Sequence, residues 1–202
     1  MIMTANSNIY TDDEICEILD DYFVNEYNLT EKSDIYQDNA LFKTAMSHMF
    51  LDELNKFKNF IENNMIIINK ISDDGLYLLH LACYAKKYEF VLFLLLSNAD
   101  PNNRDNQNKT AAHYAVISGD TSIINILTLY GIDLNIQDSD GDTSLHYAVS
   151  NNDYKMIKTL IQYNINPLIH NNNNMTALNY AVNKKISKKL SIYMAEYIKY
   201  HI

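Results

Sequence analysis

A twelve-residue pattern that recurs every 33 residues constrains the fold of this chain more than any other feature. The pattern is clearest over residues 138–149, DSDGDTSLHYAV, where a turn sequence precedes an apolar run. It returns at residues 72–83, 105–116 and 171–182. His80, His113 and His146 occupy the same position in three copies, and Asn179 takes that position in the fourth. Copies at a fixed period predict an array in which each unit buries its apolar face against its neighbours.

Each clear copy predicts the same local structure. A helix of about ten residues should begin at the Thr-x-x-His segment or its equivalent, because apolar residues follow there at helical spacing. Short turns are expected at residues 86–87, 119–120 and 152–153, each followed by a second apolar helix. Gly131, with Asn98 and Asn164 at the same position, predicts a left-handed residue at the end of that second helix.

The third copy carries D-x-x-G-x-T-x-L-H-x-A, and the second carries Gly119-Asp120 after its first helix. This arrangement resembles the ankyrin repeat. The second copy departs from the family pattern at Asn108 and Ala112, and the first has Tyr77 and Leu78 where the family has Thr-Pro. The fourth has lost the Asp, the Gly and the His. The resemblance covers residues 39–202 and implies an all-α ankyrin-repeat solenoid of about five repeats, the first and last degenerate.

Residues 1–38 form a separate acidic segment with ten acids and one lysine. Thr11 and Glu14 make a capping-box pattern, and an apolar stripe from Ile15 to Phe23 follows at helical spacing. We therefore expect a helix over residues 12–27. Because the end repeat of an array exposes an apolar face, the helix is expected to cap the first repeat. A free helix that binds a partner is the alternative.

The two ends of the array are less regular than its centre. Residues 39–69 keep Thr44 but have Ser47 where the histidine should stand, and they predict two helices. The first carries Leu41, Ala45 and Met49 on one face, which Phe42 and Met46 widen, and the second carries Leu54, Phe57, Phe60 and Ile61. The last helix has an apolar stripe flanked by lysines 184, 185, 188 and 189. We interpret it as a C-terminal cap, with a basic membrane-binding helix as the alternative; the stripe comprises Ile186, Leu190, Tyr193, Met194 and Tyr197.

Reactive residue types show no arrangement typical of a catalytic or metal site. The repeated histidines occur once per repeat, so stacking should separate them by roughly 8–10 Å, too far to share one ion. We expect them to bond to loop backbone beside a capping threonine. Asp138, Asp140 and Asp142 resemble the start of a calcium loop, but Val149 stands where its glutamate is required. We predict no catalytic residues, no metal and no cofactor.

Composition points to an intracellular location. Cys16 and Cys83 are far apart in sequence, which favours a reducing compartment, and Cys83 should be a buried free thiol. No apolar run reaches 18 residues and the start does not resemble a signal peptide, so we expect a cytoplasmic protein.

Charge changes sign along the array, from −6 over residues 100–153 to +6 over residues 154–202. We expect neither nucleic acid nor a membrane as partner, and a monomer when the protein is alone.

The ankyrin resemblance implies a binding surface on the concave side, at the loop tips and the inner ends of the first helices. Tyr84 and Arg104 are the expected anchors, because aromatic and arginine side chains tend to dominate interface energy. The resemblance also implies that Asn102 and Asn135 could be hydroxylated in an animal cytosol. Carried onto this sequence, the partner-binding set is Asp73, Asp74, Leu76, Tyr84, Arg104, Asn106, Gln107, Lys109, Ile117, Ser118, Gln137, Ser139, Asp140, Asp142, Ser150 and Asn151, continued by His170, Asn172 and Asn173 in the fourth repeat.

Three function classes follow from these observations. The first is a non-catalytic module that binds a partner protein. The second is an adaptor or inhibitor subunit that delivers a bound protein to a larger complex. An enzyme is the least favoured, because the sequence has only four glycines and no phosphate-cradling loop. The enrichment in residues with AT-rich codons fits an effector of a pathogen or symbiont, which would act in host cytosol.

Overall fold

The structure, a computed structural model, describes residues 40–72, 75–181 and 184–201. Within these ranges every regular element is a helix and there is no strand, which confirms the predicted all-α class. The chain divides into two compact units with the boundary between Asn64 and Met65. The predicted helix at residues 12–27 lies outside the described residues, as do Cys16, Asp73 and Asp74.

The first unit contains the degenerate repeat as a pair of helices, α2 (Ala40–Phe50) and α3 (Leu54–Asn63). Both helices were predicted, but the buried face of α2 differs by one residue from the prediction. Leu41 is 38% exposed, whereas Phe42, Ala45, Met46 and Met49 are buried. These four positions have the spacing i, i+3, i+4 and i+7 of one helical face, and Leu41 lies beside that face.

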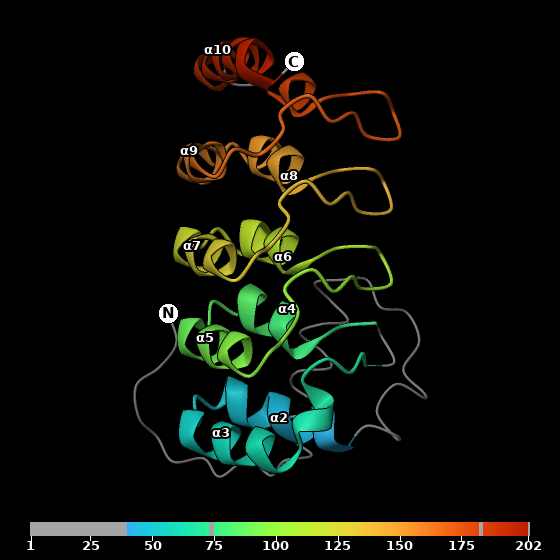
Figure 1. Cartoon of the computed structure of the whole chain (residues 1–202), viewed down its shortest axis with the longest axis vertical. Coiled ribbons are helices and arrows are strands. Elements are labelled where there is room, and N and C mark those ends of the chain that lie inside the picture. Colours follow the sequence, from blue (N-terminus) through green and yellow to red (C-terminus); the bar gives the residue numbers. More distant parts are fainter. Residues whose placement is uncertain (1–39, 73–74, 182–183, 202) are drawn as a thin grey trace. The chain divides into compact units, whose positions relative to one another are not determined.

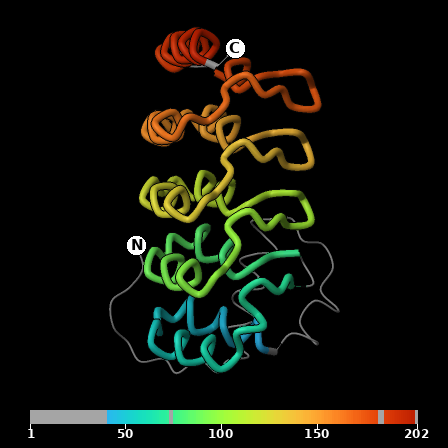
Figure 2. Tube along the Cα trace, viewed as in Figure 1, coloured from blue at the N-terminus to red at the C-terminus, as the bar shows by residue number. Residues whose placement is uncertain are grey.

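In the second unit a one-turn helix, η1 (Met65–Ile67), precedes three regular helix pairs and a final irregular one. Each regular pair has a short inner helix and an outer helix. The pairs stack in tiers, and their connecting loops project on the same side (Figures 1 and 2). The pairs are α4 (Leu78–Tyr84) with α5 (Tyr88–Leu96), α6 (Ala111–Ser118) with α7 (Thr121–Leu129), and α8 (Ser144–Ser150) with α9 (Tyr154–Gln162).

Local sequence sets where these helices start and stop. Lys86, Gly119 and Asn152 have φ values of 57°, 77° and 53°, so the chain leaves each inner helix through a left-handed residue. Because a capping residue precedes each inner helix and this turn follows it, the inner helices have seven or eight residues, fewer than the ten predicted. The aspartates before α7 and α9 cap those helices through bonds to backbone amides.

The core of the second unit lies between the inner and outer helices. The apolar residues predicted on the outer helices are buried, except for Ile161, which is partly exposed. Cys83 is a buried free thiol, as predicted, and burial raises its pKa. The three left-handed positions predicted after the outer helices are also confirmed, with φ of 66° at Asn98, 80° at Gly131 and 55° at Asn164.

The fourth repeat differs from the three regular ones. Its inner helix is a single turn, η2 (Ala177–Tyr180), and its outer helix, α10 (Lys184–His201), has 18 residues against nine in each preceding outer helix. Ile186 and Leu190 are buried in α10, while Tyr193, Met194 and Tyr197 are partly exposed. In the described part of the chain, no helix combines the length and apolar character needed to cross a membrane.

Candidate protein-binding face

The projecting loops of the second, third and fourth repeats are each built around an acid or amide at the first position. In the second repeat, Oδ1 of Asp105 accepts hydrogen bonds from the amides of Gln107 and Lys109, at 2.8 and 2.7 Å. Asp138 and Asn171 make the same pair of bonds in the third and fourth repeats. A side chain that accepts from amides two and four residues ahead closes the loop into a fixed turn.

A tyrosine nine residues later satisfies the second oxygen of these loop acids. The hydroxyl of Tyr114 donates to Oδ2 of Asp105 at 2.5 Å, and that of Tyr147 donates to Asp138 at 2.6 Å. Burial, and then the neighbouring carboxylate, raise the pKa of both tyrosines. Sequence reasoning missed this pairing, although its signal was present, since an acid and a tyrosine nine positions apart occur in both repeats.

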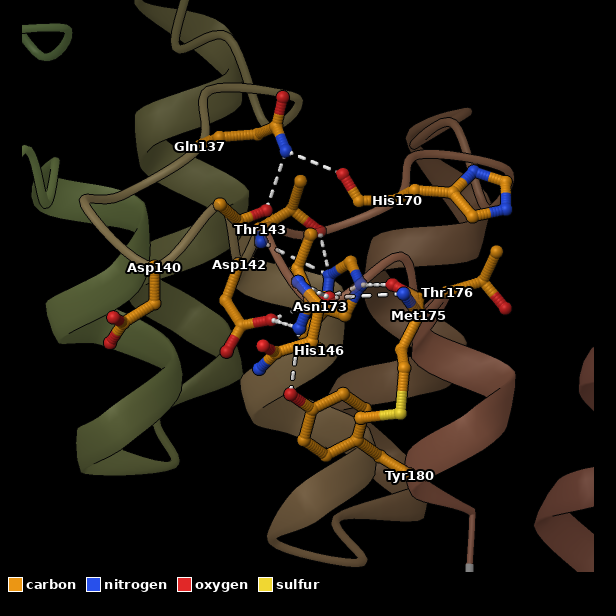
Figure 3. A network of polar contacts seen from close by, with 12 residues as sticks. Gln137, Asp140, Asp142, Thr143, His146, His170, Asn173, Met175, Thr176 and Tyr180 are labelled. Atoms are coloured by element: carbon orange, nitrogen blue, oxygen red, sulfur yellow. Dashed lines mark hydrogen bonds and ion pairs between the residues drawn. The ribbon is translucent and has the colours of Figure 1, made fainter.

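The repeated histidines link each inner helix to a neighbouring loop. Nδ1 of His113 accepts from the backbone amide of Thr110 at 3.0 Å, and its Nε2 lies 3.2 Å from the carbonyl of Asp142. Because a carbonyl cannot donate, the Nε2 nitrogen carries the proton and the ring is neutral. His146 repeats this arrangement with Thr143 and the carbonyl of Met175 (Figure 3). The predicted structural role of these histidines is confirmed.

Burial keeps these imidazoles neutral. Desolvation lowers the pKa of His80 to about 4. The hydrogen bond to the carbonyl of Asn103 raises this pKa, but by less than burial lowers it. The pKa values of His113 and His146 are lowered for the same principal reason. These neutral side chains, bonded to backbone through both ring nitrogens, hold the loops in place.

Asn179 replaces the histidine where no further described loop follows. Its Oδ1 accepts from the amide of Thr176 at 2.8 Å and from the threonine hydroxyl at 3.1 Å, and Nδ1 of His113 and of His146 makes the equivalent contacts. The histidine's other nitrogen serves to reach the next loop. An asparagine keeps the local bond and gives up that reach.

Successive loops also touch through backbone, and this contact fixes their spacing. The amide of Ser139 donates to the carbonyl of Gln107, and the amide of Asn172 donates to that of Asp140. A Cβ on Gly141 would lie 2.6 Å from the amide nitrogen of Asn172, so only glycine allows this approach. Asn108, at the same position one repeat earlier, adopts a positive φ and bonds through its side chain to the hydroxyl of Ser139.

The two asparagines singled out for hydroxylation hold neighbouring repeats together. Asn102 donates to the carbonyl of Gly131 at 3.0 Å and accepts from the amide of Asp133 at 2.7 Å. Asn135 accepts from the amide of Asn166 at 2.7 Å. A modifying enzyme would therefore have to break these contacts between repeats before it reached either side chain.

The predicted binding residues in the described ranges lie on the loops and at the ends of the inner helices, and their exposure differs. Several are also held by internal bonds. Lys109 donates to Gln107 at 2.7 Å, Gln137 donates to the carbonyls of Gly141 and His170, and Asp142 accepts from Asn171. Arg104, Asn106, Gln107, Ser139, Asp140, Ser150 and Asn151 are exposed, and Leu76, Tyr84, Lys109, Ile117, Ser118, Gln137 and Asp142 are partly buried.

This geometry agrees with a comparison against protein families. The family model described as ankyrin repeats, three copies, matches residues 51–138 and again residues 112–199. The chain belongs to the ankyrin-repeat family. No curated protein matches it in a sequence comparison. Ankyrin repeats generally mediate interactions between proteins, and proteins of this family are typically non-catalytic.

In the ankyrin fold, the repeated histidines and aspartates, which could otherwise suggest a metal or catalytic site, have structural roles. Among the described residues, no three His, Cys, Asp or Glu side chains are grouped so that they could hold a metal ion. Asp138 and Asp142, which resemble part of a calcium loop in sequence, are bonded to backbone amides and to Asn171. Loop-tip and helix-end side chains are among those that the ankyrin repeats leave open to solvent.

Proposed function

We propose that this ankyrin protein is a non-catalytic module that binds a partner protein across the face made by its loop tips and inner-helix ends. The observation that carries the proposal is a division of labour within each loop. Asp105 and Asp138 are buried and hold the turn, whereas Asn106, Ser139 and Asp140 beside them are exposed. Exposed side chains that recur on the side of the loops in successive tiers make a surface suited to recognition (Figure 1).

The character of this face favours a partner with polar and basic groups. Asp140 and Asp142 lie on the third loop, and Arg104 is the exposed cation next to the second. Tyr84, at the end of α4, is partly buried and adds an aromatic contact. A polar surface around one aromatic and one arginine anchor is typical of a protein interface whose energy comes from few residues.

Within this proposal the protein acts as a binding module in the cytoplasm, either of its own cell or of a host if it is an effector. An adaptor or inhibitor subunit that delivers the bound protein to a larger complex is the second candidate. The exposed acids on the loops favour neither nucleic acid nor an anionic membrane as the ligand of this face, because like charges repel. We propose that the protein is monomeric when alone.

The test is a pull-down followed by a binding measurement on the captured protein. Tyr84→Ala with Arg104→Ala should weaken the complex by about 2–4 kcal/mol if both side chains are anchors. Tyr88→Ala with Lys155→Ala is the matched control, because these exposed residues lie on outer helices. An unchanged dissociation constant for the Tyr84 and Arg104 variant, with an intact fold by circular dichroism, would remove this assignment.

A further inference from the structure

The outer helices α9 and α10 lie away from the projecting loops (Figure 1). A groove opens between these two helices. Its volume is about 360 Å³, within the range of about 300–1,000 Å³ typical of ligand sites. Isoleucines and aromatic rings from both helices form its floor and walls, and Ile192 is 51% exposed to solvent. The groove is lined by Tyr154, Ile157, Lys158, Ile161, Ile186, Lys189, Ile192, Tyr193 and Glu196.

One wall of the groove is the last outer helix, which differs from those before it. α10 follows the single-turn helix η2 instead of a full inner helix, and the hydroxyl of Tyr193 donates to the carbonyl of Ile165 at 2.7 Å. Ile186 and Leu190 anchor the helix by burial, while Ile192 stays largely exposed on the groove wall. An apolar wall with this exposure offers surface that a ligand can cover.

The rim of the groove is basic, and its lysines come from both walls. Lys158 belongs to α9, while Lys185 and Lys189 belong to α10. The ammonium groups of Lys185 and Lys189 lie 5.8 and 4.9 Å from the centre of the Tyr154 ring, and Lys189 also donates to its hydroxyl. This hydrogen bond, followed by the positive charge of the three lysines, lowers the pKa of Tyr154. Glu196 is the acid among the lining residues.

We propose that this groove is a second docking surface, which takes an acidic amphipathic helix from a partner protein. A helix placed between two helices buries one apolar face and leaves charged positions on both flanks. Carboxylates on those flanks would lie near Lys158 on one side and near Lys185 and Lys189 on the other. The surrounding residues 154–202 carry a net charge of +6, which extends the same complementarity beyond the rim.

The proposal is tested with the full chain and a labelled synthetic peptide. The peptide is helical, about 15 residues long, with leucines at i, i+3, i+4 and i+7 and glutamates on both flanks. We expect saturable binding by fluorescence anisotropy that weakens as sodium chloride rises from about 50 mM to about 500 mM. A peptide with lysines in place of the glutamates should bind at least about tenfold more weakly.

Matched variants locate the binding. K158E with K189E should weaken the acidic peptide by about tenfold or more, while K155E with K188E makes the same charge change outside the groove and should change little. Ile192→Asp should also weaken binding, whereas Ile198→Asp, at a position 46% exposed but outside the groove lining, should not. All four variants are on the surface, so circular dichroism should show an unchanged fold.

Three results would overturn the proposal. Equal binding of the acidic and basic peptides would show that charge does not select the ligand. Equal weakening by the groove variants and their controls would place the binding elsewhere. Self-association by light scattering that K158E with K189E abolishes would make a second copy of the chain the occupant. The Tyr84→Ala, Arg104→Ala variant should bind the peptide normally, so failure of either surface can be distinguished from failure of the other.

Discussion

Each buried histidine in this array makes two structural hydrogen bonds, one within its own repeat and one to the following loop. His113 accepts from the amide that starts its own helix and donates to the carbonyl of Asp142 in the following loop. Its ring also lies edge-on to Tyr147, whose hydroxyl holds Asp138. A neutral ring is required for the first bond, because a protonated imidazole has no acceptor. The stability of the repeats is therefore linked to proton concentration.

We predict that the protein loses stability as the pH falls below neutral. The pKa of His80 is about 4 in the folded chain, against 6.5 as its ordinary value, so the unfolded state binds more protons between these two values. The stabilisation is complete above pH 6.5 and is lost progressively down to about pH 4, at up to about 1.4 kcal/mol per pH unit for this histidine. Thermal unfolding followed at pH 7, 6 and 5 measures the slope.

A His80→Asn variant distinguishes the loss of stability caused by protonation of His80 from the loss caused by protonation of carboxylates. Asn179 shows that an asparagine can accept from the capping amide in the equivalent position. The variant should be less stable than the original chain at pH 7, since the bond to Asn103 is lost, but its melting temperature should fall less steeply with pH. An identical slope in both proteins would mean that His80 does not contribute to the pH dependence.

At one position where the repeat signature changes, the new side chain is left without a hydrogen-bond partner among the described residues. Ser47 stands where a histidine is expected in the first repeat, and it is buried. Within the described residues, its hydroxyl has no hydrogen-bond partner. An unsatisfied buried hydroxyl costs about 1–3 kcal/mol. The erosion of the signature in this repeat therefore carries an energetic cost that the neighbouring repeats avoid.

At the scale of elements, the loops are the parts whose geometry is most exacting. The second, third and fourth loops are each closed by their own acid or amide, and these consecutive loops bond through their backbones. Gly131 and Gly141 both have φ of 80°, but they differ in surroundings. Gly131 ends an outer helix with nothing near its Cα hydrogen, whereas Gly141 faces the backbone of the next loop. Substituting these two glycines therefore distinguishes the cost of a strained backbone, which both share, from the cost of steric crowding, which only Gly141 has.

We predict that Gly131→Ala costs about 1–2 kcal/mol, the penalty for a left-handed alanine. Gly141→Ala should cost about 1–3 kcal/mol more, because the new methyl group would lie 2.6 Å from the amide nitrogen of Asn172 and the loops would have to separate. Urea unfolding of the two variants measures the difference. Equal urea midpoints for the two variants would show that the fourth loop can move away without a loss of stability, so that the close contact between the loops does not stabilise the fold.

At the scale of the whole molecule, the ends of the array matter because a repeat without a neighbour exposes its apolar face. We propose that α10 covers the fourth repeat, because Ile186 and Leu190 are buried while Lys185, Lys188 and Lys189 are exposed. For the first repeat, the acidic segment with its expected helix at residues 12–27 remains the proposed cap. The alternative is that this segment binds a partner.

We expect a chain that begins at residue 36 to aggregate or to melt well below the full protein. The stripe from Ile15 to Phe23 would be lost, and burying each large apolar side chain stabilises by about 1.5–3 kcal/mol. Several such losses would approach the whole stability of about 5–15 kcal/mol. Calorimetry and light scattering provide the measurement. A shortened protein that keeps its melting temperature and stays monomeric would show that the segment is not a cap.

Sequence alone determined the features that depend on neighbours along the chain. The 33-residue period established the array, and the left-handed positions Asn98, Gly131 and Asn164 were predictable because few residue types tolerate a positive φ. The buried faces of the outer helices followed from helical spacing, and Leu41 was misplaced by one position in a stripe with several apolar neighbours. These are local constraints, which a chain carries before it folds.

Tertiary structure decided what depends on residues brought together from different repeats. The bond from His146 to the carbonyl of Met175 spans 29 positions, and the contact of Gly141 with Asn172 spans 31, so neither distance can be read from a local pattern. The groove between α9 and α10 is lined by residues as far apart as Tyr154 and Glu196, which packing brings together. Packing is a property of volumes and surfaces in three dimensions, and the period of a sequence does not specify it.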